Sequence, residues 1–224
     1  LRVPVHNLAG IVCFGVVSCS PPLMGLCAER GVSVSFLTEY GRFRASVHGP
    51  VSGNVLLRKA QYRASDDLNA SAAFARIVVA AKVANSRTVL LRAAREREDD
   101  DTAAQLRDTA GYLAALLKTL ERPAPLDVVR GIEGVAANAY FSVFDHLVTM
   151  QKEDFFYTVR SRRPPLDNLN ALLSFVYTLL VHDMRSALEG VGLDPAVGCL
   201  HRDRPGRPAL ALDLVEEFRP VIAD

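Results

Sequence analysis

The spacing of the apolar residues changes once along this chain of 224 residues, and the change restricts the possible folds more than any other feature. Over residues 3–51 the apolar runs are short, rich in Val, Ile and Phe, and separated by glycines, which is typical of β-strands. Residues 21–30 differ, because their Leu, Met and Cys side chains have helical spacing. Residues 55–97 are dominated by Ala, Leu and Arg, a composition that favours helix.

This change predicts an α+β protein with two domains. Residues 1–53 are expected to form a small N-terminal β domain with one short helix, and residues 54–224 a larger, all-helical domain. Prolines and glycines divide the second domain into further helices, at residues 102–120, at 127–150 with Asp127 as the cap, at 169–189, and from about Asp213 onward. The charge run at residues 95–101 is expected to form an exposed helix end and turn.

Charge and cysteine content argue against several classes of protein. The 26 Lys and Arg residues nearly balance the 25 Asp and Glu residues, so the net charge of +1 gives no overall attraction to a polyanion. Any nucleic-acid site must come from local clusters. The four cysteines contain no Cys-x-x-Cys pair, which favours a reduced, cytoplasmic protein. We expect no membrane contact, because the longest apolar runs are shorter than the roughly 18 residues of a membrane span and the N-terminal residues do not resemble a signal peptide.

Side chains suited to a hard or borderline metal ion occur in three segments of the helical half. In the first, Glu133 lies in the middle of a predicted helix among very small side chains, in the sequence Gly-Ile-Glu-Gly-Val-Ala-Ala-Asn-Ala-Tyr-Phe. Gly131 and Gly134 each cost a helix about 1 kcal/mol relative to alanine, so a packing or functional reason for them is expected. Tight helix packing beside an exposed Glu133 would explain the same pattern.

The other two segments combine a histidine with carboxylates and basic residues. In the second segment, His201 is followed by three arginines, Arg202, Arg204 and Arg207. This local basic character suits phosphate groups, although a lone histidine is more often an ordinary surface or core residue. In the third segment, Asp213 and Glu216 are three residues apart and share one face of a helix. An Asp-x-x-Glu pattern before an apolar run is also typical of a capping box, which needs no metal.

Together these segments resemble the three metal-ligand blocks of a known family, the catalytic integrase subunit of CRISPR adaptation. The helix Gly-Ile-Glu-Gly-x-Ala-Ala-x-x-Tyr-Phe, the loop Gly-x-Leu-His and the closing Leu-Ala-Leu-Asp-Leu-x-Glu-Glu-Phe-Arg-Pro follow the family's order. The resemblance extends over nearly the whole chain, including residues 4–15, 49–58, 82–87 and 163–177. It implies an N-terminal β domain that forms a homodimer and a helical domain that holds the metal. Family members usually have additional strands before Leu1 and continue beyond Asp224, so we expect this chain to be a fragment whose β domain lacks its first strands.

The resemblance also implies the residues and the reaction. Glu133, His201 and Glu216 correspond to the catalytic metal ligands and Asp213 to the acidic residue beside them, whereas Glu217 has no such correspondence. Two carboxylates and one imidazole suit Mg²⁺ or Mn²⁺. In the implied transesterification, the 3′-hydroxyl of a foreign DNA fragment attacks a phosphodiester at the edge of a repeat, and the same site can act on branched DNA or cleave with water. The implied partners are double-stranded and branched DNA, a second copy of the chain, a small companion adaptation protein and a trimming nuclease.

The candidate DNA contacts are polar residues outside the metal ligands, namely Lys82, Arg87, Arg160, Arg162, Arg163, Asn170, Tyr177 and Arg202. Three of the arginines precede a Pro-Pro pair that stiffens the loop, which suits phosphate contacts. Asn170 and Tyr177 are seven residues apart, hence on one helical face, and the resemblance places both near the active site. A buried Tyr177 with a satisfied hydroxyl is the alternative. Lys82 and Arg87 match basic family positions, but would also suit a solvated helix face.

Two other functions fit the sequence. A metal-dependent DNA nuclease that does not integrate would share the site and only hydrolyse DNA, so strand transfer into a repeat-containing duplex distinguishes it. A catalytically silent scaffold that bridges DNA and the companion protein would bind no Mn²⁺, and it would lose nothing when Glu133 is changed.

Overall fold

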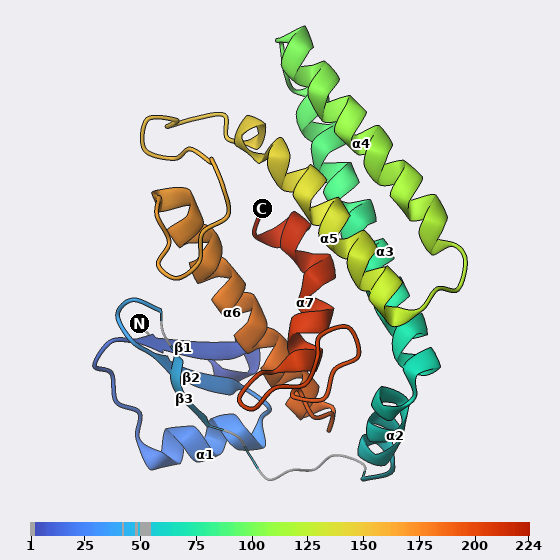
Figure 1. Cartoon of the computed structure of the whole chain (residues 1–224). Coiled ribbons are helices and arrows are strands. Elements are labelled where there is room, and N and C mark those ends of the chain that lie inside the picture. The colour runs from blue at the N-terminus through green and yellow to red at the C-terminus, as the bar shows by residue number, and fades with distance from the viewer. Residues whose placement is uncertain (1–2, 42, 48, 50–54) are drawn as a thin grey trace.

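The computed structural model describes residues 3–41, 43–47, 49 and 55–224, and it has the predicted α+β class, with a three-stranded sheet followed by a mostly helical region (Figure 1). In chain order the elements are η1 (Val5–Asn7), β1 (Gly10–Phe14), α1 (Pro21–Glu29), β2 (Ser33–Leu37), β3 (Phe43–Val47), α2 (Val55–Asp66), α3 (Leu68–Arg95), α4 (Asp100–Leu120), α5 (Leu126–Ser142), η2 (Phe144–Leu147), α6 (Asn168–Gly190) and α7 (Ala209–Ile222). The predicted domain boundary at residue 53 lies outside the described residues. In the part of the chain that the structure describes, every helix is too short or too polar to cross a membrane.

The sheet depends on α1, which connects two parallel strands. β1 pairs with β2 in parallel, with Gly10 opposite Ser33, and β2 pairs with β3 in antiparallel orientation. Parallel neighbours need a crossover connection, and α1 supplies it. The buried side chain of Cys27 on this helix packs with Val32 and Val34 to form a small core under the sheet. The expected β domain with one short helix is therefore confirmed.

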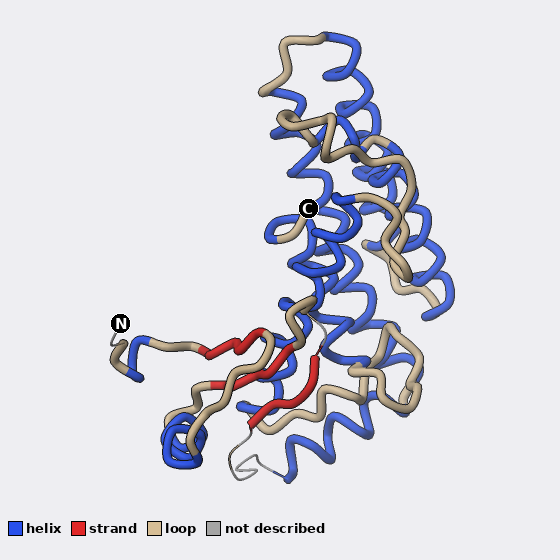
Figure 2. Tube along the Cα trace, turned by 90° about the vertical axis from the view of Figure 1, so that its left-hand side faces the viewer, coloured by secondary structure: helices blue, strands red, loops and turns tan. Residues whose placement is uncertain are grey.

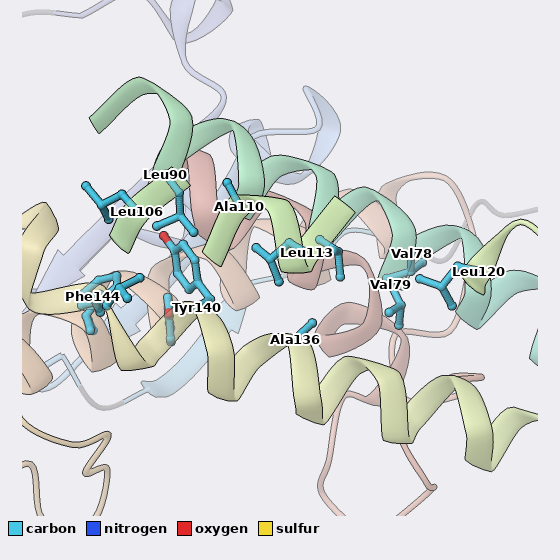
Figure 3. Close-up of a cluster of buried hydrophobic side chains, with 14 of the residues drawn as sticks. Val78, Val79, Leu90, Leu106, Ala110, Leu113, Leu120, Ala136, Tyr140 and Phe144 are labelled. Carbon is cyan, nitrogen blue, oxygen red and sulfur yellow. The ribbon is translucent and has the colours of Figure 1, made fainter. Parts of the chain in front are cut away.

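Helix α3 is the centre of the helical region, because it packs against α4, α5 and α7 (Figure 1). Its buried stripe includes Val79, Val83 and Leu90. Val79 and Leu90 lie in one hydrophobic core with Leu106 and Leu113 of α4 (Figure 3). Burial of each such side chain contributes about 1.5–3 kcal/mol relative to exposure. The same core contains Val129 and Ala136 of α5, and α3 also packs against α7, so the helices that carry Lys82, Glu133 and Glu216 are held together.

The charge run at residues 95–101 forms the predicted helix end and turn. α3 ends at Arg95, and α4 begins at Asp100 with Asp99 as its N-cap. The last helix begins earlier than predicted, at Ala209 instead of near Asp213. Residues 209–212 are Ala-Leu-Ala-Leu and already suit a helix, whereas the loop before them is polar and contains Pro205 and Pro208.

The predicted helix at residues 127–150 is shorter, because α5 ends at Ser142. The chain turns there, and Phe144 packs edge-on against Tyr140 and Tyr157 in a buried aromatic cluster. The prediction that Asp127 caps α5 was wrong. Pro125 precedes the helix without a side-chain cap, and the Asp127 carboxylate accepts a 2.9 Å hydrogen bond from Arg130 one turn later.

Aromatic contacts join the sheet to α6. Phe43 of β3 stacks on His182 of α6 with ring centroids 4.5 Å apart, and Phe14 at the end of β1 lies 5.9 Å from the ring of Phe175. Figure 2 shows the strands gathered at one end of the molecule. Gly41 allows the close approach of the sheet region to α6, since a Cβ atom there would lie 2.8 Å from a ring carbon of Phe175.

We expect Gly41→Ala to lower the free energy of unfolding by more than Gly31→Ala does. Both glycines have positive φ angles, 76° and 68°, so a side chain at either position costs about 1–2 kcal/mol of backbone strain. Only Gly41 lies against another residue, because a Cβ at Gly31 meets nothing within 4 Å. Overpacking against Phe175 should add about 1–3 kcal/mol, measured by urea unfolding. Equal losses for the two variants would contradict the contact.

Candidate active site

The Asp213 carboxylate organises the loop that contains His201. It is fully buried on α7, and its Oδ2 accepts hydrogen bonds from the backbone N–H groups of Cys199 at 2.7 Å and Leu200 at 2.9 Å. Its Oδ1 accepts from the His201 backbone N–H at 2.9 Å and from His201 Nδ1 at 2.6 Å. A carboxylate can only accept, so Nδ1 carries a proton, and in a neutral ring Nε2 is then the acceptor. This is the arrangement in which a carboxylate orients a metal-binding histidine.

The capping-box interpretation of Asp213 and Glu216 is therefore wrong. Asp213 lies inside α7, and its carboxylate bonds to Cys199 and Leu200 in the loop before the helix instead of the first turn of the helix. The residue that precedes the helix is Pro208, which makes no side-chain cap.

Two further features fix this loop. Gln61 of α2 donates from its side chain to the carbonyl oxygens of Asp194 at 2.7 Å and Val197 at 3.0 Å. At Gly198 the loop passes so close to α7 that a Cβ would lie 2.7 Å from the carbonyl carbon of Ala209 and 2.8 Å from Asp213 Oδ2. Sequence reasoning missed Gln61, since no local pattern marks it.

Glu133 and Glu216 meet at the side chain of Lys82. The Lys82 Nζ atom, on α3, contacts Glu133 Oε1 of α5 and lies 2.6 Å from Glu216 Oε2 of α7. Arg219, one turn after Glu216, also donates to the Glu216 carboxylate. Burial by itself lowers the pKa of Lys82, but attraction to Glu216 and Glu133 outweighs it and the pKa lies above its ordinary value. Burial likewise raises the pKa of Glu216, but Lys82 and Arg219 hold that pKa below its ordinary value.

All three predicted ligands line one cavity of about 860 Å³. Its walls also carry Lys82 and six arginines, Arg160, Arg162, Arg163, Arg204, Arg207 and Arg219. Among the described residues, no group of three or more His, Cys, Asp and Glu side chains is arranged to hold a metal ion. The Lys82 ammonium lies between the two carboxylates instead.

Of the two reasons considered for the glycines of α5, packing or function, the described residues show no packing reason. A Cβ atom at Gly131 or Gly134 would meet nothing within 4 Å. The helix face beside Glu133 is therefore open, and close packing of the described residues does not explain the two glycines.

The predicted DNA contacts divide into exposed and buried residues. Arg162 and Arg163 are exposed at the cavity. Asn170 is fully buried, and its Oδ1 accepts from Arg160 at 2.6 Å and from the backbone N–H of Ser161 at 3.1 Å. Arg160 is thereby held within the protein. Burial of Asn170 does not fit a direct DNA contact. Its hydrogen bonds fit a role in positioning the loop at residues 160–163.

Tyr177 is buried and its hydroxyl is hydrogen-bonded, which is the alternative that the sequence left open to a DNA contact. Two guanidinium groups lie over its ring, Arg219 at 4.6 Å and Arg160 at 5.5 Å from the centroid. Its hydroxyl donates to Asp224, and burial raises the pKa of Tyr177. Burial also raises the pKa of Asp224, to about 6.

The remaining basic residues lie elsewhere. Arg202 is exposed beside a second cavity of about 1010 Å³, which also reaches His201. Arg87 is half-buried on α3, and its Nε atom makes no hydrogen bond within the described residues. Sequence reasoning missed Arg219, although its spacing of three residues from Glu216 on a helix was a usable signal.

A model of the protein family described as CRISPR associated protein Cas1 matches residues 1–224. The chain belongs to the Cas1 family. A CRISPR-associated endonuclease Cas1 from Chlorobaculum tepidum is 54% identical over 223 residues, which cover 100% of this chain and 65% of the relative. A fusion of a CRISPR-associated exonuclease Cas4 with an endonuclease Cas1, from Rhodospirillum rubrum, is 40% identical over 98% of this chain and 38% of the fusion. The chain thus spans less than two thirds of the Chlorobaculum Cas1.

Solved structures related to Cas1 have the same fold. A CAS1 protein from Thermotoga maritima has a TM-score of 0.76 at 25% identity, over 99% of this chain and 67% of that chain. A casposase bound to an integration product has a TM-score of 0.75 at 27% identity, over 96% of this chain and 58% of that chain. A Cas6-RT-Cas1–Cas2 complex has a TM-score of 0.73 at 25% identity, over 96% of this chain and 23% of that chain. The resemblance inferred from the sequence is confirmed.

We expect Gly198→Ala to destabilise the protein by about 1–3 kcal/mol, because the added methyl group would push α7 away from the loop or displace Asp213. Gly111→Ala is the matched control. A Cβ at Gly111 meets nothing within 4 Å in the middle of α4, so this change should stabilise by roughly 0.5–1 kcal/mol. Urea unfolding measures both. A Gly198→Ala variant as stable as the parent would contradict the close approach.

Proposed function

We propose that this chain contains the active site of a metal-dependent DNA endonuclease and integrase of CRISPR adaptation. In the reaction, the 3′-hydroxyl of a foreign DNA fragment attacks a phosphodiester at the edge of a repeat and forms a new P–O bond. The P–O3′ bond of the target strand breaks, and its 3′-oxygen leaves as a hydroxyl, so the number of phosphodiesters and protons is unchanged. The observation that supports it most directly is the convergence of Glu133 and Glu216 on one cation, in a cavity that His201 also lines.

The residues of the cavity fit a divalent metal ion. Two carboxylates from different helices already place oxygen atoms around a positive charge, which here is the Lys82 ammonium. Because Asp213 binds Nδ1 of His201, Nε2 is the ring nitrogen that a neutral His201 would offer to a metal ion. Carboxylate and imidazole donors suit Mg²⁺ or Mn²⁺. When bound, the ion would act as a Lewis acid that lowers the pKa of a hydroxyl and neutralises charge on the reacting phosphate.

The other groups of the site bind and position. Asp213 holds the His201 ring and its loop, and Arg219 holds the buried Glu216 carboxylate. Arg162, Arg163 and Arg204 are exposed at the cavity, where guanidinium groups can bind phosphate oxygens in pairs. The substrate class is therefore DNA, held by its backbone with a phosphodiester near the carboxylates.

The proposed partners follow from the relatives. The Rhodospirillum protein joins a Cas4 exonuclease to Cas1, which supports a trimming nuclease as a partner. A solved complex contains Cas1 with Cas2, which supports the small companion protein. The β domain is the proposed homodimer interface. A nuclease that only hydrolyses DNA is the second candidate, and the solved casposase bound to an integration product favours strand transfer over it.

We expect Glu133→Ala, His201→Ala and Glu216→Ala each to abolish Mn²⁺-dependent strand transfer and cleavage. DNA binding should remain largely intact, because the exposed arginines that contact phosphate are separate residues. Glu217→Ala is the matched control, since Glu217 does not line the cavity, and it should keep near-parent activity. The assay is transfer of a labelled fragment into a repeat-containing duplex, with folding checked by circular dichroism. A folded Glu216→Ala variant that still integrates DNA would refute that ligand assignment.

Neutralising Arg162 and Arg163 together should weaken duplex binding and reduce its salt dependence. Each lost phosphate contact should make the slope of log K against log salt shallower by about 0.9 for duplex DNA. The double glutamine variant should lose up to about two such contacts. Changing Arg95 and Arg107 to glutamine is the control, because both are exposed away from the cavity. Fluorescence anisotropy at several salt concentrations measures the slope. An unchanged slope in the Arg162, Arg163 variant would remove both residues from the interface.

A further inference from the structure

Lys82 is a nearly buried cation between two carboxylates. Its side chain is 12% exposed, and the side chain of Glu216 is 4% exposed. Because like charges repel strongly away from water, two carboxylates brought together there need a positive charge between them. Lys82 supplies that charge for Glu133 and Glu216, and Arg219 adds a second cation on the far oxygen of Glu216. The four side chains are thus electrically balanced without any bound ion.

The Lys82 ammonium contacts the same carboxylate oxygens that the proposed metal ion would use. An ammonium group and a divalent ion cannot both contact these oxygens at one position, because they exclude and repel each other. Lys82 must therefore leave when a metal ion binds. Its flexible four-carbon stem allows the movement, and the cavity beside it is lined by the exposed arginines Arg162, Arg163 and Arg204.

We infer that Lys82 is an internal counter-cation that holds Glu133 and Glu216 together in the metal-free protein, and that metal binding releases its ammonium to a DNA phosphate in the adjoining cavity. Lys82 is then a positioning residue before the metal binds and a DNA ligand afterwards. This inference rests on the proposed function, because it requires a metal ion at Glu133 and Glu216.

Lys82 couples metal binding to DNA binding. The free protein keeps Lys82 on the carboxylates, so Lys82 competes with the metal ion. A bound metal ion makes one more cationic group available to DNA, and DNA that attracts Lys82 removes the competitor. Metal and DNA should therefore strengthen each other's binding, since coupling between two ligands is reciprocal.

Mn²⁺ titration by calorimetry, without DNA, tests whether Lys82 competes with the metal ion for the carboxylates. Lys82→Met keeps much of the side-chain volume and removes the charge, so Mn²⁺ should bind about tenfold more tightly, within the usual range for coupled ligands. Lys118→Met is the matched control, because Lys118 is exposed on α4 and the net charge change is the same. This control should bind Mn²⁺ like the parent. Equal or weaker Mn²⁺ binding by folded Lys82→Met overturns the inference.

Stability gives a second measurement in case Lys82→Met folds poorly. The two carboxylates then lack their cation, so the variant should unfold at a lower temperature than the parent without metal. Mn²⁺ should raise its unfolding temperature by more than it raises that of the parent. A lysine that serves only as a structural ion pair predicts no such rescue, and the absence of rescue overturns the inference.

The salt dependence of duplex binding tests whether the released Lys82 binds a DNA phosphate. Without metal, the parent and Lys82→Met should have equal slopes, because Lys82 is bound to the carboxylates. With Mn²⁺ the parent slope should be steeper than that of Lys82→Met by about 0.9, the value for one phosphate contact. A denaturing gel checks that the duplex stays intact. Equal slopes in Mn²⁺ overturn the phosphate role.

Failure of the proposed function would look different. If neither the parent nor Lys82→Met binds Mn²⁺, the metal centre is wrong and this inference falls with it. If both bind Mn²⁺ with equal affinity, and Glu133→Ala does not bind it, the metal centre stands and only the role of Lys82 is overturned.

Discussion

The Asp213 carboxylate is fully buried, and it accepts hydrogen bonds from three backbone N–H groups and from the His201 ring. An isolated carboxylate would be very costly in that position, so the loop and α7 depend on each other. The loop supplies the donors and the helix supplies the charge. The close approach leaves no room for a side chain at Gly198. The orientation of His201 and its position at the cavity follow from this one carboxylate.

Helix α3 contributes packing and charge to the same region. It contacts both α5 and α7, so a side chain at their junction can reach carboxylates on both. Val83 of α3 is buried in the core, and its neighbour Lys82 contacts Glu133 and Glu216. Asn85, one turn later, donates to the Glu217 carbonyl oxygen at 2.8 Å. The core stripe of α3 thereby fixes the separation of the helices that carry the two carboxylates.

The charge of the chain is organised locally. A net charge of +1 gives no overall field, yet one cavity gathers six arginines and Lys82 around Glu133 and Glu216. Buried cations neutralise the carboxylates, and the exposed arginines of the cavity, Arg162, Arg163 and Arg204, make no ion pair with another described residue. This separation suits a proposed substrate whose charge lies on phosphate oxygens, because the exposed arginines can bind the backbone while the carboxylates stay available to a metal ion.

The sequence by itself determined the class of fold, most helices, the family and the segments around Glu133, His201 and Glu216. These are local properties, because periodicity, capping and motif blocks are written in neighbouring residues. Tertiary structure decided which groups meet. Lys82 and Glu133 are 51 residues apart, and no local pattern shows that a basic residue on one helix serves carboxylates on two others. The same holds for Asn170 of α6, whose burial against Arg160 indicates that it positions the loop at residues 160–163. The end of α5 at Ser142 was also decided by packing, since Phe144 belongs to an aromatic cluster that includes the distant Tyr157.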